Sequence, residues 1–90
     1  MPEMIRYRDL IRLLLRHGFE AEGVTGPHRL FVHSASDTKI LLPSSPLTDM
    51  AMPAQIVSVR RLLDERGLLP EDRFETEVRS SRNGHVRSRS

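Results

Sequence analysis

The chain has 90 residues, with 14 Lys and Arg, 12 Asp and Glu, and no Cys. This length is that of one small domain, and a hydrophobic content of 38% is typical of a globular rather than a disordered chain. The lack of Cys excludes a disulfide framework and a Cys-ligated zinc or iron–sulfur site. No apolar run approaches the roughly 18 residues that span a membrane, and no apolar signal core follows Met1, so a cytoplasmic location is expected.

Charge is distributed unevenly along the chain. Residues 1–78 carry a net charge of −2, whereas residues 79–90 contain four Arg and no acid. The body therefore lacks the basic surface on which tight non-specific binding to nucleic acids depends. The Ser/Arg-rich segment 79–90 has one apolar residue and cannot form a core, which predicts a single domain over 1–78 and a disordered tail.

The first expected element is a helix over residues 8–17. Apolar residues at the spacing i, i+3, i+4 and i+7 form one face of this helix: Tyr7, Leu10, Ile11 and Leu14. Arg8, Arg12 and Arg16 fall on the opposite side, and Gly18 is a suitable stop. No residue of N-cap type precedes the helix, so its start is expected to lack a cap.

Three short strands are expected next, over residues 19–24, 29–33 and 38–42, with Pro43 closing the third. Gly26-Pro27 and the segment 34–37 have the composition of turns. These connections are too short for parallel crossovers, so the strands are expected to form an antiparallel meander.

A second helix is expected over residues 53–66, and a short third one from Pro70. Their expected buried residues are Ile56, Val59, Leu62 and Leu63 in the former, and Phe74 and Val78 in the latter. The fold class is therefore α+β, with a three-stranded antiparallel sheet, helices on one face, and the order α-β-β-β-α plus a short C-terminal helix. The other face is left uncovered, and Phe31, Leu41 or Val57, if exposed, would mark a partner surface.

Histidines are the main candidates for chemistry. His17 ends the first helix, where a structural role is favoured, and His85 lies in the tail. The odd spacing of His28 and His33 places them on opposite faces of one strand, so they are not expected to share a site. No spacing of His, Asp or Glu suggests a metal, and no cofactor is expected.

Five segments occur in an order that matches a known family: Arg6–Leu14, His17–Phe19, Gly26–His33, Ile40–Pro43 and Arg60–Leu68. Together they resemble the HicA family of toxins, which are small mRNA interferases. The resemblance implies a fold like that of the double-stranded-RNA-binding domain, metal-independent cleavage of mRNA, and neutralisation by a HicB-like antitoxin. It also implies that His28 corresponds to the catalytic histidine of the family.

Imidazole suits this reaction, because a neutral histidine can take the proton from a ribose 2′-hydroxyl near neutral pH. The phosphorane charge needs cationic or N–H partners, for which Arg29 and Lys39 are the nearest candidates. Arg8 and Arg12 are candidates for contacts with RNA phosphates, although a solvated face of an amphipathic helix is the favoured interpretation. The chain departs from the family pattern at Pro27, where a small residue such as Ser is usual, and at Ser44-Ser45, where a His often follows the Pro.

Two other functions stay open. One is a catalytically silent module on the same fold that binds RNA or a protein. The other is a small oligomerising protein, such as a weak homodimer, because a chain of this length has a thin core to which self-association would add stability.

Overall fold

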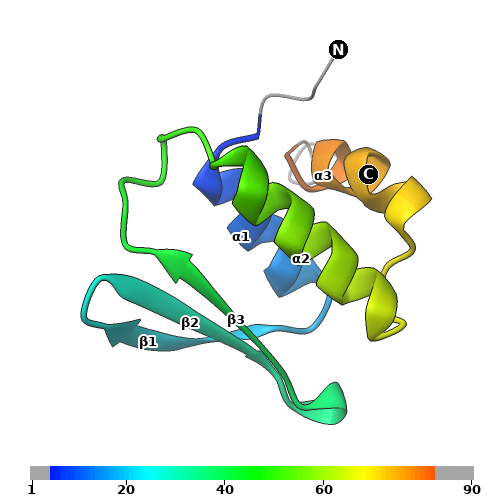
Figure 1. Cartoon of the computed structure of the whole chain (residues 1–90), viewed down its shortest axis with the longest axis horizontal. Helices are drawn as coiled ribbons and strands as arrows, with labels where there is room; N and C mark the ends of the chain where they lie inside the picture. The colour runs from blue at the N-terminus through cyan, green and yellow to red at the C-terminus, as the bar shows by residue number, and fades with distance from the viewer. Residues whose placement is uncertain (1–4, 83–90) are drawn as a thin grey trace, which may run out of the picture.

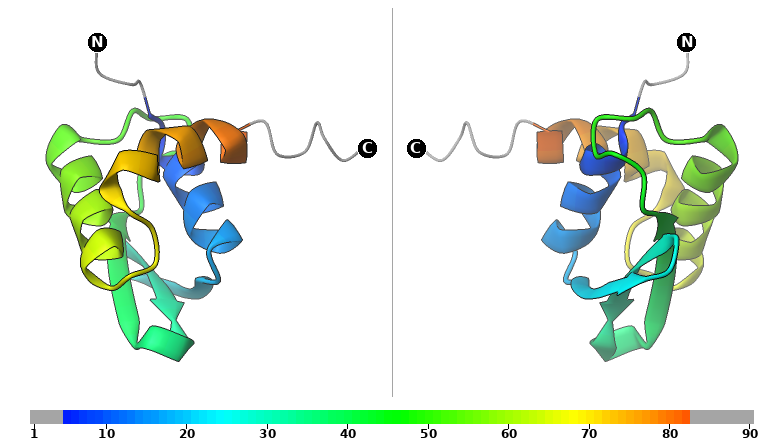
Figure 2. Two further views of the ribbon diagram at one scale, coloured as in Figure 1. Left: turned by 90° about the vertical axis from the view of Figure 1, so that its right-hand side faces the viewer. Right: turned by 90° about the vertical axis from the view of Figure 1, so that its left-hand side faces the viewer.

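Residues 5–82 are described by the computed structural model of the chain. The elements in chain order are α1 (Tyr7–Arg16), β1 (Glu20–Thr25), β2 (His28–His33), η1 (Ser34–Ser36), β3 (Thr38–Pro43), α2 (Pro53–Glu65), η2 (Glu71–Arg73) and α3 (Phe74–Arg82). The three strands form one antiparallel sheet, and all three α-helices lie on the same side of it (Figures 1 and 2). The expected α+β fold and its element order are confirmed.

The sheet has the strand order β1-β2-β3, which is that of a simple meander. Thr25 pairs with His28, so only Gly26 and Pro27 connect β1 to β2. Gly26 has a φ of 60°, and the ring of Pro27 restricts φ to a negative value, which is the combination of a type II′ hairpin turn. The pairing of β1 with β2 shifts between Ala21 and Gly23.

The two faces of the sheet differ sharply in burial. Along β3, Thr38, Ile40 and Leu42 are buried, whereas Lys39 and Leu41 are exposed. Directly paired residues of neighbouring strands point to the same face. The side without helices, here called the open face, therefore carries Glu20 and Gly23 of β1, His28, Leu30 and Val32 of β2, and Lys39, Leu41 and Pro43 of β3.

The core lies between the sheet and the helices. Its buried residues come from every layer and include Leu10, Leu13, Leu14, Phe19, Phe31, Ile40, Leu42, Val59, Leu63, Phe74 and Val78. Ile56 and Leu62 of α2 pack against this cluster while partly exposed. Phe31 is thus ordinary core, whereas Leu41 is exposed and lies on the open face.

The N-cap residue of α1, Arg6, makes no side-chain cap bond, as expected, but other groups satisfy the helix start. A carboxylate oxygen of the buried Asp9 accepts the backbone N–H of Arg6 at 3.0 Å. Backbone carbonyls of the loop before α2 accept the first helical N–H groups, with Asp49 bound to Tyr7 and Leu47 bound to Arg8, both at 3.0 Å. The backbone N–H groups at the start of a helix have no partner within the helix. Here the loop carbonyls and Asp9 together replace a conventional N-cap.

Helix α3 is held by Phe74 and Val78, as expected, since both are fully buried. It continues to Arg82, so residues 79–82, expected to belong to the tail, are helical. Ser81 is buried, and its hydroxyl donates to the backbone carbonyl of Glu77 at 2.9 Å. Residues 83–90 of the expected tail lie outside the described residues.

Candidate functional site

His28 lies at the first position of β2, directly after the Gly26-Pro27 turn, and is exposed. Its pairing with Pro43 places it on the open face. The carbonyl of Pro27 accepts the backbone N–H of Ser44 at 2.8 Å, which ties the chain after β3 to the turn. Within residues 5–82 no hydrogen bond or ion pair engages the His28 ring, so the imidazole is accessible to an outside molecule.

Lys39 shares the open face with His28 but lies at a distance from it. Its partner on β2 is Val32, four residues along the strand from His28. At about 3.4 Å per residue, this offset separates the two backbone positions by roughly 14 Å along the strand direction. Lys39 is therefore not adjacent to an anion that His28 would contact.

Arg29 follows His28 in sequence but points to the other face of the sheet. It pairs with Leu42, whose side chain is buried under the helices. Because successive residues of a strand alternate between faces, Arg29 and His28 lie on opposite sides. The two residues do not form one site, although they are neighbours in the chain.

Arg8 and Arg12 are exposed on α1, in the helical layer. The sheet lies between this layer and the open face (Figure 2). The candidate RNA contacts named above, Arg8, Arg12, Arg29 and Lys39, are thus distributed over both sides of the domain, and only Lys39 shares a face with His28.

His33 is partly buried on the helical side, as its odd spacing from His28 predicts. Its Nδ1 accepts the backbone N–H of Ser36 at 3.3 Å and lies 2.7 Å from the Ser36 hydroxyl. Its ring is 5.2 Å from that of Phe19, measured between centroids. These contacts hold the η1 turn and leave His33 with a structural role.

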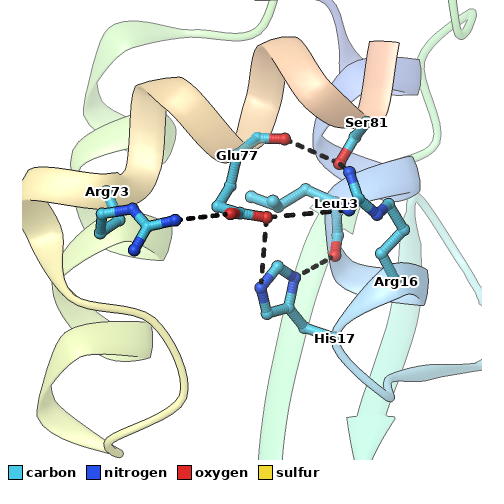
Figure 3. Close-up of polar contacts among 6 residues, drawn as sticks. All are labelled: Leu13, Arg16, His17, Arg73, Glu77 and Ser81. Atoms are coloured by element: carbon cyan, nitrogen blue, oxygen red, sulfur yellow. Dashed lines mark hydrogen bonds and ion pairs between the residues drawn. The ribbon is translucent and has the colours of Figure 1, made fainter. Parts of the chain in front are cut away.

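His17 also has a structural environment. Its Nδ1 lies 3.0 Å from the backbone oxygen of Leu13, so Nδ1 is the donor, and Nε2 lies 3.9 Å from Glu77 (Figure 3). Glu77 also contacts Arg16 at 4.0 Å and Arg73 at 3.4 Å. No sequence signal identifies Glu77 as a member of this cluster, because its partners on α1 lie about sixty positions away in the chain.

The chemistry available around His28 is that of a proton acceptor with few anion-binding groups. Pro27 and Pro43 flank it and have no backbone N–H, and the N–H of Ser44 is already bonded. Within residues 5–82 no group of three His, Asp or Glu side chains could hold a metal ion. The helices in this part of the chain also include none with the length and apolar content of a membrane span.

A comparison of the chain with protein-family models, curated proteins and solved structures finds no match.

Proposed function

We propose that the chain is an RNA-cleaving toxin of the HicA type, with His28 as its general base. The observation that carries this proposal is the position of His28: it is exposed at a fixed turn on the uncovered face of the sheet, and no side chain within the described residues engages its ring. Fold and element order agree with the resemblance drawn from the sequence.

In the proposed reaction, neutral His28 accepts the proton of a ribose 2′-hydroxyl. The 2′-oxygen forms a bond to the adjacent phosphorus, and the bond from phosphorus to the 5′-oxygen of the next nucleotide breaks. The leaving oxygen takes up a proton, which the imidazolium can return. The products are a 2′,3′-cyclic phosphate and a 5′-hydroxyl, with no metal or redox partner required.

A cytoplasmic location follows from this role, because mRNA is the substrate class. The partner that would silence such a toxin is a HicB-like antitoxin protein, and the open face around His28 is the surface that it would need to cover.

A catalytically silent RNA-binding module is the second candidate. One observation favours it: within residues 5–82, no Lys or Arg lies beside His28 on the open face, because Arg29 points away and Lys39 is four paired positions further along. Without a group to stabilise the phosphorane charge, the rate of cleavage would be low, since such stabilisation is often the largest single catalytic contribution.

The test compares wild type, His28→Ala and a control, Arg61→Ala, in which the change lies on the exposed side of α2. Each protein is expressed from an inducible promoter in a bacterium, and each purified protein is incubated with RNA in the presence of EDTA. Growth and intact mRNA are measured in the first assay, and 2′,3′-cyclic phosphate ends in the second.

Toxicity and cyclic phosphate ends in wild type and Arg61→Ala, with loss of both in His28→Ala, are the expected results. Equal activity of His28→Ala would reject His28 as the base. If no protein cleaves RNA but binding weakens with salt, the silent module is supported, and Lys39→Ala should then reduce the slope of log K against log salt by about 0.7.

A further inference from the structure

The open face carries apolar side chains that the proposed catalysis does not use; Leu41 is exposed, and Leu30 and Val32 are partly buried. Leu41 is 55% exposed and pairs with Leu30, which in turn pairs with Gly23 of β1. Val32, two residues further along β2 from Leu30 and away from His28, lies on the same face. The two leucines and Val32 thus form a continuous apolar strip across β2 and β3.

Opposite charges lie at the two edges of this face. Glu20 on β1, Val32 on β2 and Lys39 on β3 form one row, and both charged residues are exposed. Two strand spacings, about 10 Å, separate Glu20 from Lys39. No ion pair joins them within the part of the chain that the structure describes, so each is available to a partner.

This arrangement is complementary to itself under one symmetry operation. If two open faces stack about a two-fold axis parallel to β2, then β1 of each copy lies over β3 of the other, and β2 lies over β2. Glu20 of each copy then faces Lys39 of the other, which gives two equivalent ion pairs. In the neighbouring row, the large Leu41 of each copy faces Gly23 of the other, where no side chain obstructs it.

We propose that the open face is a homodimer interface, occupied by a second copy of this chain about that two-fold axis. The dimer is isologous, as most soluble homodimers are, and its two sheets stack with nearly aligned strands, which is a common packing of two sheets. The commitment to a second copy rests on charge complementarity and on the match of Leu41 with Gly23. It does not depend on the proposed cleavage of RNA.

The interface is small, so the dimer is expected to be reversible. Three strands of six residues offer a face of roughly 300 Å² per copy, compared with about 800 Å² in a standard stable interface. Because His28 lies on the same face, dimerisation would cover it. Dilution would dissociate the dimer and expose His28 again.

Sedimentation velocity on the full chain tests the proposal, at concentrations up to about 1 mM, since interfaces of this size bind weakly. The samples are wild type, Lys39→Glu, Glu20→Lys, the double variant with both changes, and an equimolar mixture of the two single variants. Circular dichroism confirms that each variant is folded. Both positions are exposed on edge strands, so the substitutions leave the core intact.

Wild type should show a concentration-dependent shift toward a dimer. Each single variant should associate roughly tenfold more weakly or worse, because like charges would meet twice across the axis. The double variant should regain the wild-type association constant. The mixture should form a heterodimer, because a copy with two carboxylates in the row then meets a copy with two ammonium groups.

A wild type that stays monomeric throughout this range overturns the proposal. So does association that neither single variant weakens, since another surface would then be the interface. A double variant that associates while the mixture does not would overturn the two-fold geometry. Leu41→Ser gives a second measurement on the apolar strip and should also weaken association.

Discussion

Nε2 of His17, at the end of α1, lies 3.9 Å from a carboxylate oxygen of Glu77 on α3. The other ring nitrogen is bound to the carbonyl of Leu13, which sets the orientation of the imidazole (Figure 3). The same carboxylate contacts Arg16 and Arg73. Glu77 therefore joins two helices that are distant in sequence, beside the apolar contact that Val78 makes with the core.

The first prediction concerns this carboxylate. Glu77→Gln should lower the free energy of unfolding by about 1 kcal/mol, because partly exposed ion pairs contribute modestly even in a network. Glu75→Gln is the control, because Glu75 lies on the same helix, is exposed and takes no part in this cluster. Urea unfolding followed by circular dichroism measures both. Equal losses for the two variants would show that Glu77 does not link α1 to α3.

The second prediction concerns two neighbouring leucines of β3. Leu42 is 1% exposed and Leu41 is 55% exposed, so the same substitution tests which face the helices cover. Leu42→Ala should cost about 2–5 kcal/mol of unfolding free energy through loss of buried contacts and the cavity left behind. Leu41→Ala should change it by less than about 0.5 kcal/mol. Chemical denaturation at a concentration where the chain is monomeric measures both, and comparable losses would mean that the open face is covered.

The third prediction concerns the approach of Gly18 to His33. Gly18 has a φ of 91°, and a Cβ added there would lie 3.1 Å from two atoms of the His33 ring. Gly18→Ala should therefore destabilise the fold by at least about 1 kcal/mol, from backbone strain together with the contact.

A double-mutant cycle separates these two causes. His33→Ala alone should destabilise the chain, because the bonds to Ser36 and the packing on Phe19 are lost. The double variant with Gly18→Ala should lose less unfolding free energy than the sum of the losses in the two single variants. The reason is that the ring that obstructs the new Cβ is absent. Strict additivity of the two unfolding free energies would assign the whole Gly18 effect to backbone strain.

The fourth prediction concerns the start of α1. Asp9 is 3% exposed, and its carboxylate accepts the N–H of Arg6. Asp9→Ala should lower the free energy of unfolding by about 1–2 kcal/mol, in the range of a lost helix cap. Asp64→Ala, at an exposed position near the end of α2, is the control and should have little effect. A loss no larger than that of the control would contradict a capping role.

Most of the secondary structure follows from local patterns. The helical spacing around Leu10 and the alternation of Lys39, Ile40 and Leu41 are properties of short segments. The three strands and the first two helices lie within two residues of their predicted bounds, whereas the third helix, predicted from Pro70, begins at Phe74 and extends to Arg82. The cap of α1 could have been found from sequence, because Asp9 stands at the third helical position, where an acidic side chain can reach back to the preceding backbone. The docking of the 44–52 loop carbonyls on α1 carries no such local signal.

The candidate site divides in the same way. Alternation along β2 was sufficient to place His28 and His33 on opposite faces, and the same rule, applied to His28 and Arg29, separates them as well. Arg29 is adjacent to His28 along the chain, but strand periodicity and not chain distance decides which face its side chain occupies. The offset of Lys39 required the register of β2 with β3, which depends on which residues fill the core beneath them.

The amino-acid sequence by itself determined the α+β class, the meander and the exposed strand position of His28, because periodicity, turn residues and short connections act within a few residues. Only the tertiary structure decided that α3 reaches Arg82, that Glu77 meets His17, and that Glu20 and Lys39 occupy the two edges of one row. These relationships join residues far apart in the chain. They are set by how the helices and strands bury their apolar faces together, which no single segment encodes.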